Sequence, residues 1–398
     1  MTLPTNREIP PRERATARFA GVLAREVVES IDLRAEPERL ARGGWWAVVG
    51  DFSGHVRAWR FAHVERSSDA RGRADGRART DGTAGADGGA KPGGAATPAG
   101  GPRDWRGPRP DEWRSSMSRA QYEAAVGATR DLIREGEVYQ ANICRVLRAP
   151  LPVSDDGTEP DALALADRLA LANPAPFAGA LHVPHGGGVP AAWVVSASPE
   201  LFLRLEAGRL TSSPIKGTAV HESGLGDKDR AENVMITDLV RNDLQRVCIP
   251  GSVDVTALLV VERHPGLVHL VSTVAGELRP EIAGARDAWA QILDGTYPPG
   301  SVSGAPKSSA LRTIAALEPV DRGPYCGAFG WIDADAGRAE LAVAIRTFWW
   351  DAAKGGTLRF GTGAGITWGS HPTAEWEETE LKARRLVQIA SSGPDWSP

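Results

Sequence analysis

The spacing of apolar residues divides most of the chain into helix-like and strand-like segments. The pattern predicts helices at residues 17–30, 117–135, 228–247 and 372–390, with Ser118 starting the second helix and Gly136 ending it. Short apolar or alternating runs predict strands at 45–52, 55–64, 141–149, 191–197, 200–210, 252–264, 266–278 and 357–368, and a hairpin at 327–350 that turns near 335–337. Because the strands come in hairpins with helices between them, the pattern indicates an α+β fold rather than a βαβ repeat.

One region breaks this pattern. Residues 67–110 are mainly Gly, Ala, Arg, Asp, Pro and Thr, with almost no large apolar side chains. Such a segment buries too little apolar surface to offset its ordering entropy, which predicts a disordered insert. The chain is therefore expected to have three regions: residues 1–66, which pack on the main body, the insert at 67–110, and a globular domain at 111–393.

Composition and charge narrow the classes of protein. The 398 residues are 42% hydrophobic and 24% charged, as in a soluble globular protein. A net charge of -4 argues against a general nucleic-acid or membrane-surface binder, because both need a basic face. No secretory signal or bilayer-spanning run is visible, and Cys144, Cys248 and Cys326 lack metal-ligand or disulfide-like spacing. We therefore expect a cytoplasmic protein in a reducing compartment.

A single lysine stands out in TSSPIKGTAV, residues 211–220. Lys216 lies in a predicted short turn between two strand-like runs, and its nearest charged neighbours in the sequence are Arg209 and Glu222. A solvent-exposed lysine usually has other charges near it. This lysine therefore either points its ammonium at water or is held in a site where it can react, and the pattern alone leaves both interpretations open.

The last predicted helix carries a group of charges on one face. Glu375, Glu378 and Lys382 are spaced three and then four residues apart, so they share that face. They could form an ordinary surface network in which Glu378 and Lys382 make an i,i+4 ion pair. Alternatively, the carboxylates belong to a Mg²⁺ site, because Mg²⁺ is held by one or two carboxylates together with substrate oxygens. Glu232, near the start of the helix at 228–247, is the candidate partner carboxylate.

Four further features are candidates for ligand contacts. GTGAGI, residues 361–366, is a poor dinucleotide-binding motif, because a helix should follow such a motif immediately and Pro372 stands before the next predicted helix. It fits better a strand end whose backbone N–H groups face an anion, or a bulge or site of tight packing. Glu200 lies between two predicted strands, where a solvent-facing turn acid is also common. Arg346 is a charge within an apolar strand and needs an anionic partner. His269 is isolated in an apolar strand, a position typical of a hydrogen-bonded core residue.

Ten motifs together resemble the chorismate-utilising enzymes, the family of anthranilate synthase component I, aminodeoxychorismate synthase component I and the isochorismate synthases. In chain order, from about Glu135 to Arg385, they are GEVYQANICR, NPAPFAGAL, SASPELF, SSPIKGT, KDRAENVMITDLVRNDL, GSVSGAPK, YCGAFGW, AIRTF, GTGAGI and EWEETELKA. KDRAEN and PIKGT are the most specific. The resemblance implies a layered α/β/β/α sandwich with mostly antiparallel sheets, helices outside and the active site between two halves. Residues 111–393 would then be the chorismate-utilising catalytic domain.

The resemblance also implies a metal site that holds the substrate. Glu232 and Glu378 would bind Mg²⁺, with Glu375 close by, and the metal would hold the ring carboxylate of chorismate. Lys382 would assist there. The backbone of three residues in GTGAGI would do the same: Gly363, Ala364 and Gly365.

A second set of residues would carry the chemistry. Arg346 would bind the enolpyruvyl carboxylate, Glu200 would be the general acid that protonates the departing 4-hydroxyl, and His269 would lie near the ring. Gln140 stands where isochorismate-forming members carry a water-activating lysine, and glutamine is typical of the ammonia-using members. PIKGT, with Lys216 as nucleophile, is typical of the aminodeoxychorismate synthases, whereas anthranilate synthases typically read PIAGT.

What this implies is a Mg²⁺-dependent amination of chorismate to 4-amino-4-deoxychorismate. Lys216, kept neutral by burial and by the neighbouring Mg²⁺, would attack C2 while Glu200 helps to expel the 4-hydroxyl. Ammonia would then enter at C4 and displace the lysine. No cysteine lies in a glutaminase-like context, so the ammonia is expected from a separate glutamine amidotransferase subunit.

Some features depart from the family, and other functions remain as alternatives. The segment between PIKGT and KDRAEN is short, Ala219 stands where arginine is common, and no LLES-like tryptophan-binding element is visible, so tryptophan feedback is not expected. The alternatives are an anthranilate synthase component I, which Lys216 opposes, and an isochorismate or salicylate synthase, which Gln140 opposes. A non-catalytic chorismate-binding protein is a third, but it would not require Glu200 and Lys216.

Overall fold

The computed structural model describes residues 10–67, 104–219, 221–264 and 267–391. The helices there are α1 (Pro11–Arg14), α2 (Arg119–Arg134), α3 (Ala162–Ala172), α4 (Asp227–Gln245), α5 (Pro280–Ala283), α6 (Ala288–Thr296), α7 (Lys307–Leu317) and α8 (Pro372–Ala390). The strands are β1 (Thr16–Phe19), β2 (Val22–Asp32), β3 (Trp45–Gly50), β4 (Val56–Arg66), β5 (Arg114–Ser115), β6 (Gln140–Pro150), β7 (Phe177–Val183), β8 (Ala192–Ser198), β9 (Leu201–Glu206), β10 (Arg209–Ser213), β11 (Ile215–Ala219), β12 (Asp254–His264), β13 (Leu267–Glu277), β14 (Gly304–Ala305), β15 (Ala328–Asp333), β16 (Arg338–Val343), β17 (Thr347–Asp351) and β18 (Thr357–Ile366).

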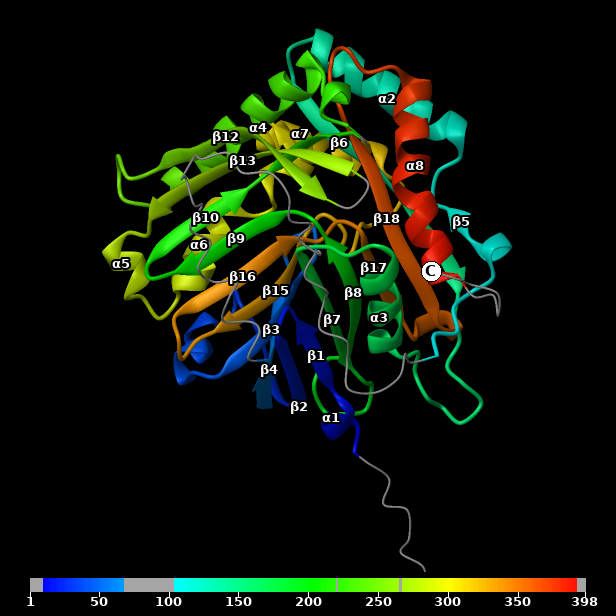
Figure 1. The fold of residues 1–398 in the computed structure, drawn as a ribbon, viewed down its shortest axis with the longest axis vertical. Coiled ribbons are helices and arrows are strands. Elements are labelled where there is room, and N and C mark those ends of the chain that lie inside the picture. The colour runs from blue at the N-terminus through cyan, green and yellow to red at the C-terminus, as the bar shows by residue number, and fades with distance from the viewer. Residues whose placement is uncertain (1–9, 68–103, 220, 265–266, 392–398) are drawn as a thin grey trace, which may run out of the picture.

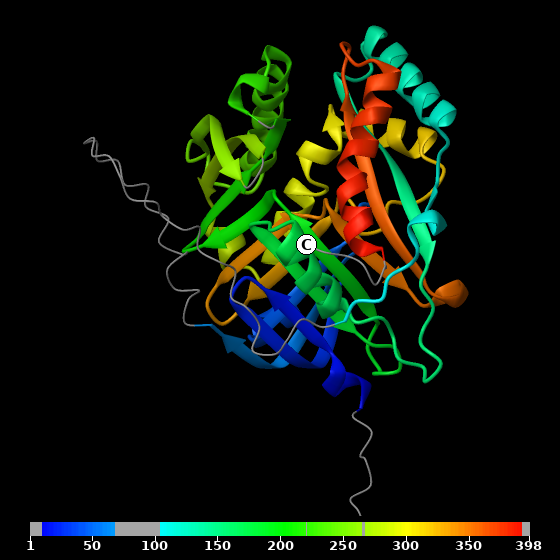
Figure 2. The same ribbon diagram turned by 45° about the vertical axis from the view of Figure 1, so that its right-hand side comes forward.

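The strands pair in one continuous antiparallel ladder. From one end it runs β5, β6, β18, β17, β8, β7, β1, β2, β4, β3, β15, β16, β9, β10, β13 and β12. The ladder starts in an arm built on β6 and β18 and ends in an arm built on β12 and β13. The N-terminal strands join the two, as the blue segment below both arms shows (Figures 1 and 2).

Each arm carries helices on its outer side. In one arm α8 packs on β18 and against α2, while in the other α4 packs on β13 (Figure 1). The largest apolar core lies under the connecting strands and includes Ile31, Trp46 and Phe329, all at most 1% exposed. Burial of such large side chains stabilises the ladder against which the two arms are held. The architecture confirms the predicted α+β fold with mostly antiparallel strands and outer helices.

Local sequence signals explain several elements as predicted. Ser118 caps α2 by accepting a hydrogen bond from the Gln121 N–H, and the Gln121 side chain accepts one from the Ser118 N–H. The hairpin of β15 and β16 turns at residues 334–337, where Gly337 has a φ of +60° that favours glycine. Within the described residues, no helix is long and apolar enough to cross a bilayer.

The predicted helix at residues 17–30 is wrong. These residues form a hairpin in which Phe19 pairs with Val22, and the turn contains Gly21 at a φ of +72°. The β-branched residues that follow, including Val27 and Ile31, favour a strand, and their burial depends on pairing with β4. Tertiary pairing therefore overrides a pattern that is compatible with a helix.

The predicted insert at 67–110 ends too late in the sequence, because its last residues belong to the packed structure. Residues 104–110 are described, and Trp105 is buried there with its indole N–H donating to the Ala390 carbonyl at 2.8 Å. The boundary of the packed body therefore lies before Trp105. Residues 68–103, the rest of the predicted insert, lie outside the described residues.

Candidate active site

Lys216 lies in a short, irregular strand rather than in the predicted turn. β11 pairs with β13 at Ile215 and Thr218, but the register shifts between them, so Lys216 sits in a bulge. Gly217 has a φ of +85°, and a Cβ there would lie 2.8 Å from the Asp229 Cβ at the start of α4. Glycine thus allows the bulge to approach α4 closely, and the bulge places the half-buried Lys216 side chain beside the other predicted site residues.

Glu200 occupies the corner between β8 and β9 and is 3% exposed. The Ser198 hydroxyl fixes the corner, because it accepts from the Glu200 N–H and donates to the Val343 carbonyl. Burial raises the pKa of Glu200 to about 7, although the Ser301 hydroxyl and the Lys216 ammonium oppose the rise. The carboxyl group is therefore poised to hold or release a proton near neutral pH.

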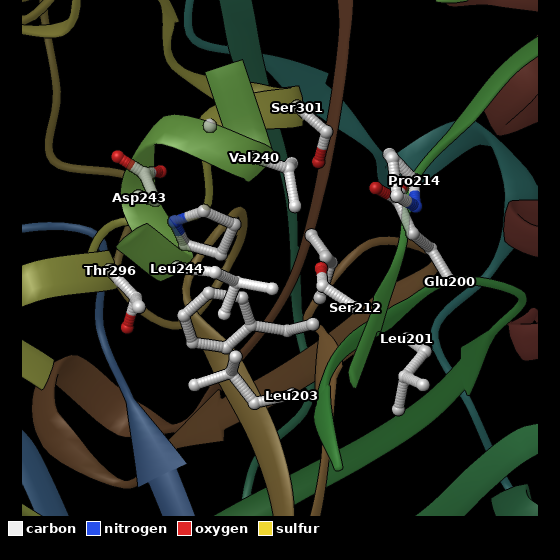
Figure 3. A pocket seen from close by; sticks show the side chains of 14 residues that line it. Glu200, Leu201, Leu203, Ser212, Pro214, Val240, Asp243, Leu244, Thr296 and Ser301 are labelled. Atoms are coloured by element: carbon white, nitrogen blue, oxygen red, sulfur yellow. The ribbon is translucent and has the colours of Figure 1, made fainter. Parts of the chain in front are cut away.

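A cavity adjoins Glu200. It encloses about 300 Å³ of empty space, part of it open to solvent, and Figure 3 shows Glu200 on one side with Asp243 and Thr296 on the other. Most of its lining is apolar, and it includes the polar Ser301 and Ser212. The apolar lining is the physical source of the desolvation at Glu200.

The glycine-rich GTGAGI stretch forms the second half of β18 and pairs with β6 throughout. β17 pairs only with residues 357–360, so among the described strands the other edge of β18 beyond Phe360 has no ladder partner. A Cβ on Gly365 would overlap the Gln140 amide nitrogen and lie 3.5 Å from Lys216 Nζ. Gly365 therefore allows the side chains of Gln140 and Lys216 to lie close together. The two features predicted as alternatives for GTGAGI, tight packing and a strand edge left open by the described strands, both occur in this stretch.

Gln140 is 1% exposed, and its side-chain oxygen has no hydrogen-bond partner among the described residues. A buried carbonyl oxygen without a donor costs roughly 1–3 kcal/mol, so such a group commonly faces a ligand or water. Further along β18, Ala364 is 1% exposed and Gly363 packs against Cys144. The strand pair thus presents one unpaired acceptor beside the Lys216 amine.

The three predicted metal carboxylates come from two arms. Glu232 is on α4, and Glu375 and Glu378 are on α8. Burial raises the pKa of Glu232; the carboxylates of Glu375 and Glu378 add to the rise, and the ammonium groups of Lys216 and Lys228 oppose it. Burial also acts to raise the pKa of Glu378, but the ammonium groups of Lys382, Lys216 and Lys228 together outweigh it and hold that pKa below its usual value. The three carboxylates are therefore near enough to repel one another.

Two ammonium groups neutralise this cluster. Lys382 Nζ lies 2.6 Å from Glu378 and donates to the Gly363 carbonyl at 3.1 Å. Lys228 Nζ lies between the arms, 3.8 Å from Glu232 and 3.5 Å from Glu375. As they stand, no three His, Cys, Asp or Glu side chains among the described residues form a metal-binding group. Carboxylates are nevertheless the donors that Mg²⁺ prefers, and a cation already lies between two of them.

The remaining two predicted site residues are placed less directly. Arg346 follows the end of β16 instead of lying inside a strand as predicted, with a φ of +53° that is unusual for arginine. Burial lowers the pKa of its guanidinium, which has no carboxylate or hydrogen-bond partner within the described part of the chain. His269 is 1% exposed in β13, directly opposite Thr218 and so next to the Lys216 bulge.

Sequence reasoning missed three polar residues of this region. Ser301 contacts the Glu200 carboxyl, Lys228 bridges two carboxylates, and Lys307 pairs with the buried Asp243 at 2.7 Å on the far side of the cavity. All three belong to the quoted motifs GSVSGAPK or KDRAEN. Motif membership was thus the available signal, but spacing did not show which motif residues face the site.

A buried acid and a carboxylate cluster thus lie within electrostatic reach of one lysine, Lys216. The family model described as chorismate binding enzyme matches residues 7–388, and the chain belongs to this family. That match extends well beyond the motifs at 135–385 and includes the N-terminal strands.

Curated relatives of two kinds are similar to the chain. Aminodeoxychorismate synthase component 1 of Salmonella typhimurium is 37% identical over 287 residues, which cover 69% of this chain and 58% of the relative. Anthranilate synthase component 1 of Aeropyrum pernix is 39% identical over 281 residues, which cover 68% and 59%. The matched region thus spans less than two thirds of either relative, and identity does not separate the two activities.

Solved structures confirm the fold. A putative 2,3-dihydroxybenzoate-specific isochorismate synthase from Bacillus anthracis superposes with a TM-score of 0.69 at 20% identity, over 96% of this chain and 97% of that one. Anthranilate synthase component I from Streptococcus pneumoniae gives a TM-score of 0.69 at 21% identity, over 97% and 95%. At these identities the likeness establishes the architecture of the chain.

Proposed function

We propose that the protein is an aminodeoxychorismate synthase component I, which converts chorismate and ammonia to 4-amino-4-deoxychorismate. The observation that carries the proposal is the position of Lys216, whose amine lies beside Gly365 and acts electrostatically on Glu200, Glu232 and Glu378. A lysine held there, next to a buried acid, is suited to nucleophilic catalysis. The same placement supports the second interpretation of the PIKGT lysine, in which it is held in a site where it can react.

In the first step the Lys216 amine, which must lose its ammonium proton in order to react, forms a bond to C2 of chorismate. The two conjugated ring double bonds shift, the C4–O bond breaks, and Glu200 passes its proton to the departing oxygen, which leaves as water. A pKa of about 7 supports this role, because much of Glu200 is protonated at neutral pH. The enolpyruvyl carboxylate is assigned to Arg346, whose buried guanidinium lacks an anionic partner among the described residues.

In the second step ammonia attacks C4 and the two ring double bonds shift back. The bond between C2 and Lys216 breaks, and its electron pair returns to the lysine nitrogen. The new ammonium group gives one proton to the Glu200 carboxylate, which restores the starting acid. The unpaired side-chain oxygen of Gln140 is suited to accept a hydrogen bond from ammonia beside Lys216, and His269 would lie near the ring.

The carboxylate cluster is assigned to Mg²⁺. Glu232 and Glu378 would bind the metal, with Glu375 close by, and the bound metal would hold the ring carboxylate and favour the charge that develops there. Lys382, which already contacts the Gly363 carbonyl, would orient the substrate from the other side. Desolvation and positioning of the two carboxylates of chorismate would then place C2 and C4 at Lys216 and Glu200.

We assign the ammonia supply to a separate glutamine amidotransferase subunit in the cytoplasm. The relatives are named component 1, which supports a partner component. The three cysteines are all buried free thiols, which agrees with a reducing compartment. Anthranilate synthase component I is the second candidate, favoured by the comparable identity of several anthranilate synthase relatives, including that of Aeropyrum pernix.

The proposal is tested with the Lys216→Ala variant, assayed with chorismate, Mg²⁺ and an ammonium salt. Loss of the lysine removes the covalent route, so we expect formation of 4-amino-4-deoxychorismate to fall at least about a hundredfold. Arg209→Ala, an exposed change on the neighbouring strand β10, is the control and should keep wild-type activity. Amination at C4 that persists in Lys216→Ala would rule out the lysine as nucleophile.

A further inference from the structure

Lys228 stands between the two arms at the point where the carboxylates meet. Its ammonium lies 3.8 Å from Glu232 on α4 and 3.5 Å from Glu375 on α8, so it is the charge that bridges the arms. Both distances exceed those of a good charge-assisted hydrogen bond. The interaction is therefore mainly electrostatic and has little directional constraint.

Lys228 and Lys382 neutralise the cluster in different ways. Lys382 is 51% exposed, yet it is held by a 2.6 Å contact to Glu378 and a hydrogen bond to the Gly363 carbonyl. Lys228 is 53% exposed and, within the described part of the chain, makes two longer ion-pair contacts. Lys228 lies on the first turn of α4 and its own side chain is exposed, so the ammonium can rotate into solvent, whereas its partners Glu375 and Glu232 are only 4% and 17% exposed and need another cation in its place. Of the two cations, Lys228 is the one that can leave.

The charge balance makes departure necessary when a divalent cation enters. Three carboxylates are here opposed by the ammonium groups of Lys216, Lys228 and Lys382, whose fields reach them. Adding two positive charges would leave an excess on the cluster and place Lys228 next to a like charge. A bound divalent cation would then repel most strongly the Lys228 ammonium, which lies between Glu232 and Glu375.

We propose that Lys228 is a built-in counter-ion of the carboxylate cluster, which Mg²⁺ must displace in order to bind. This inference rests on the proposed metal site. Lys228 would keep the arms attracted to each other in the metal-free protein and weaken metal binding by competing for the same carboxylates. Its removal should therefore strengthen Mg²⁺ binding, whereas removal of a residue that only supports the site would weaken it.

The test is calorimetric titration of the chorismate-free protein with MgCl₂, for wild type, Lys228→Gln and Arg230→Gln. Arg230 is an exposed cation two residues further along the same helix, without an ion pair to the described residues, so it matches the change in net charge. We expect the Mg²⁺ dissociation constant of Lys228→Gln to be about fivefold lower than that of wild type at low ionic strength. Arg230→Gln should stay within about twofold, and the gain should shrink in about 0.5 M salt.

Several results would overturn the inference. An unchanged constant in Lys228→Gln, or an equal gain in both variants, would mean that Lys228 does not compete at the site. Weaker binding in Lys228→Gln would mean that the lysine positions the carboxylates instead. Absence of Mg²⁺ binding in all three proteins would remove both the counter-ion and the metal assignment, while C4 amination by wild type would still report separately on the proposed reaction.

Discussion

The two sides of the candidate site are built differently. The strand side carries Glu200, Gln140 and His269, which are at most 3% exposed; ladder pairing fixes Gln140 and His269, and the Ser198 hydroxyl fixes the corner at Glu200. The helix side joins the carboxylates of Glu375 and Glu232, which are 4% and 17% exposed, to the ammonium group of Lys228, which is 53% exposed. One side thus works in a desolvated environment, and the other holds an exposed cation that can exchange partners.

This difference assigns proton transfer to the strand side and the binding of metal and substrate to the helix side. Desolvation on the strand side shifts the proton affinity of Glu200 towards neutrality, which general acid catalysis requires. On the helix side the ammonium groups of Lys228 and Lys382 are 53% and 51% exposed, so a metal could take the place of a cation at the carboxylates. Changes on the strand side should therefore damage turnover, and changes on the helix side should mainly alter binding.

The largest effect is expected from Glu200→Gln. The variant keeps the size of the side chain but cannot donate the acid proton, so kcat with free ammonia should fall by about 10³-fold, within the usual range for general acid catalysis. In wild type, the protonated fraction of Glu200 falls as pH rises through about 7, so kcat should decline above that pH.

A pH–rate profile checks this account of Glu200. Any residual activity of Glu200→Gln should lack the decline near pH 7 that wild type shows. A variant that retains near wild-type kcat, or the same alkaline limb, would show that another group delivers the proton.

Glu378→Gln should act on binding. Removing one proposed metal carboxylate should raise the Mg²⁺ concentration needed for half-maximal activity by about 10–100-fold, as expected when a metal site loses a supporting group. Glu377→Gln, an exposed neighbour on α8, is the matched control and should titrate as wild type does. Superimposable Mg²⁺ titrations for Glu378→Gln and wild type would remove Glu378 from the site.

A smaller effect is expected from Gly365→Ala. The added Cβ would overlap the buried Gln140 amide and press on Lys216, so KM for ammonia and kcat should each worsen by about tenfold at most, since overpacking costs about 1–3 kcal/mol. Gly369→Ala places a Cβ where nothing lies within 4 Å and should be silent. Equal kinetics in the two variants would show that the contact between Gly365 and Gln140 does not shape the site.

The fold was predictable where local signals and tertiary packing agree. The capping box at Ser118 and the turn at Gly337 fixed α2 and the β15–β16 hairpin from sequence. Residues 17–30 failed because a helical pattern and a hairpin share the same apolar positions, and only pairing with β4 and β7 decides between them. Lys216 was predicted in a turn because its irregular pairing depends on β13, more than fifty residues away in the chain.

The site was predictable from motifs but not from spacing. Glu232 is distant in sequence from Glu375 and Glu378, and the approach of α4 to α8 brings it to them. Gln140 and Lys216 are also distant in sequence and meet beside Gly365. Ser301 and Lys228 went unnoticed because their contacts depend on side-chain directions that motif letters do not encode. Arg346 was predicted within a strand, yet its left-handed backbone depends on how β17 joins β8.

The central claim is that Lys216 directs nitrogen to C4 of chorismate. The most direct test is mass-resolved chromatography of the product that the purified wild-type chain makes from chorismate, Mg²⁺ and an ammonium salt, because free ammonia bypasses any partner subunit. The account predicts a product with an amine in place of the 4-hydroxyl and with the enolpyruvyl group retained. Fluorescent anthranilate with released pyruvate would contradict it and assign the chain to the second candidate activity.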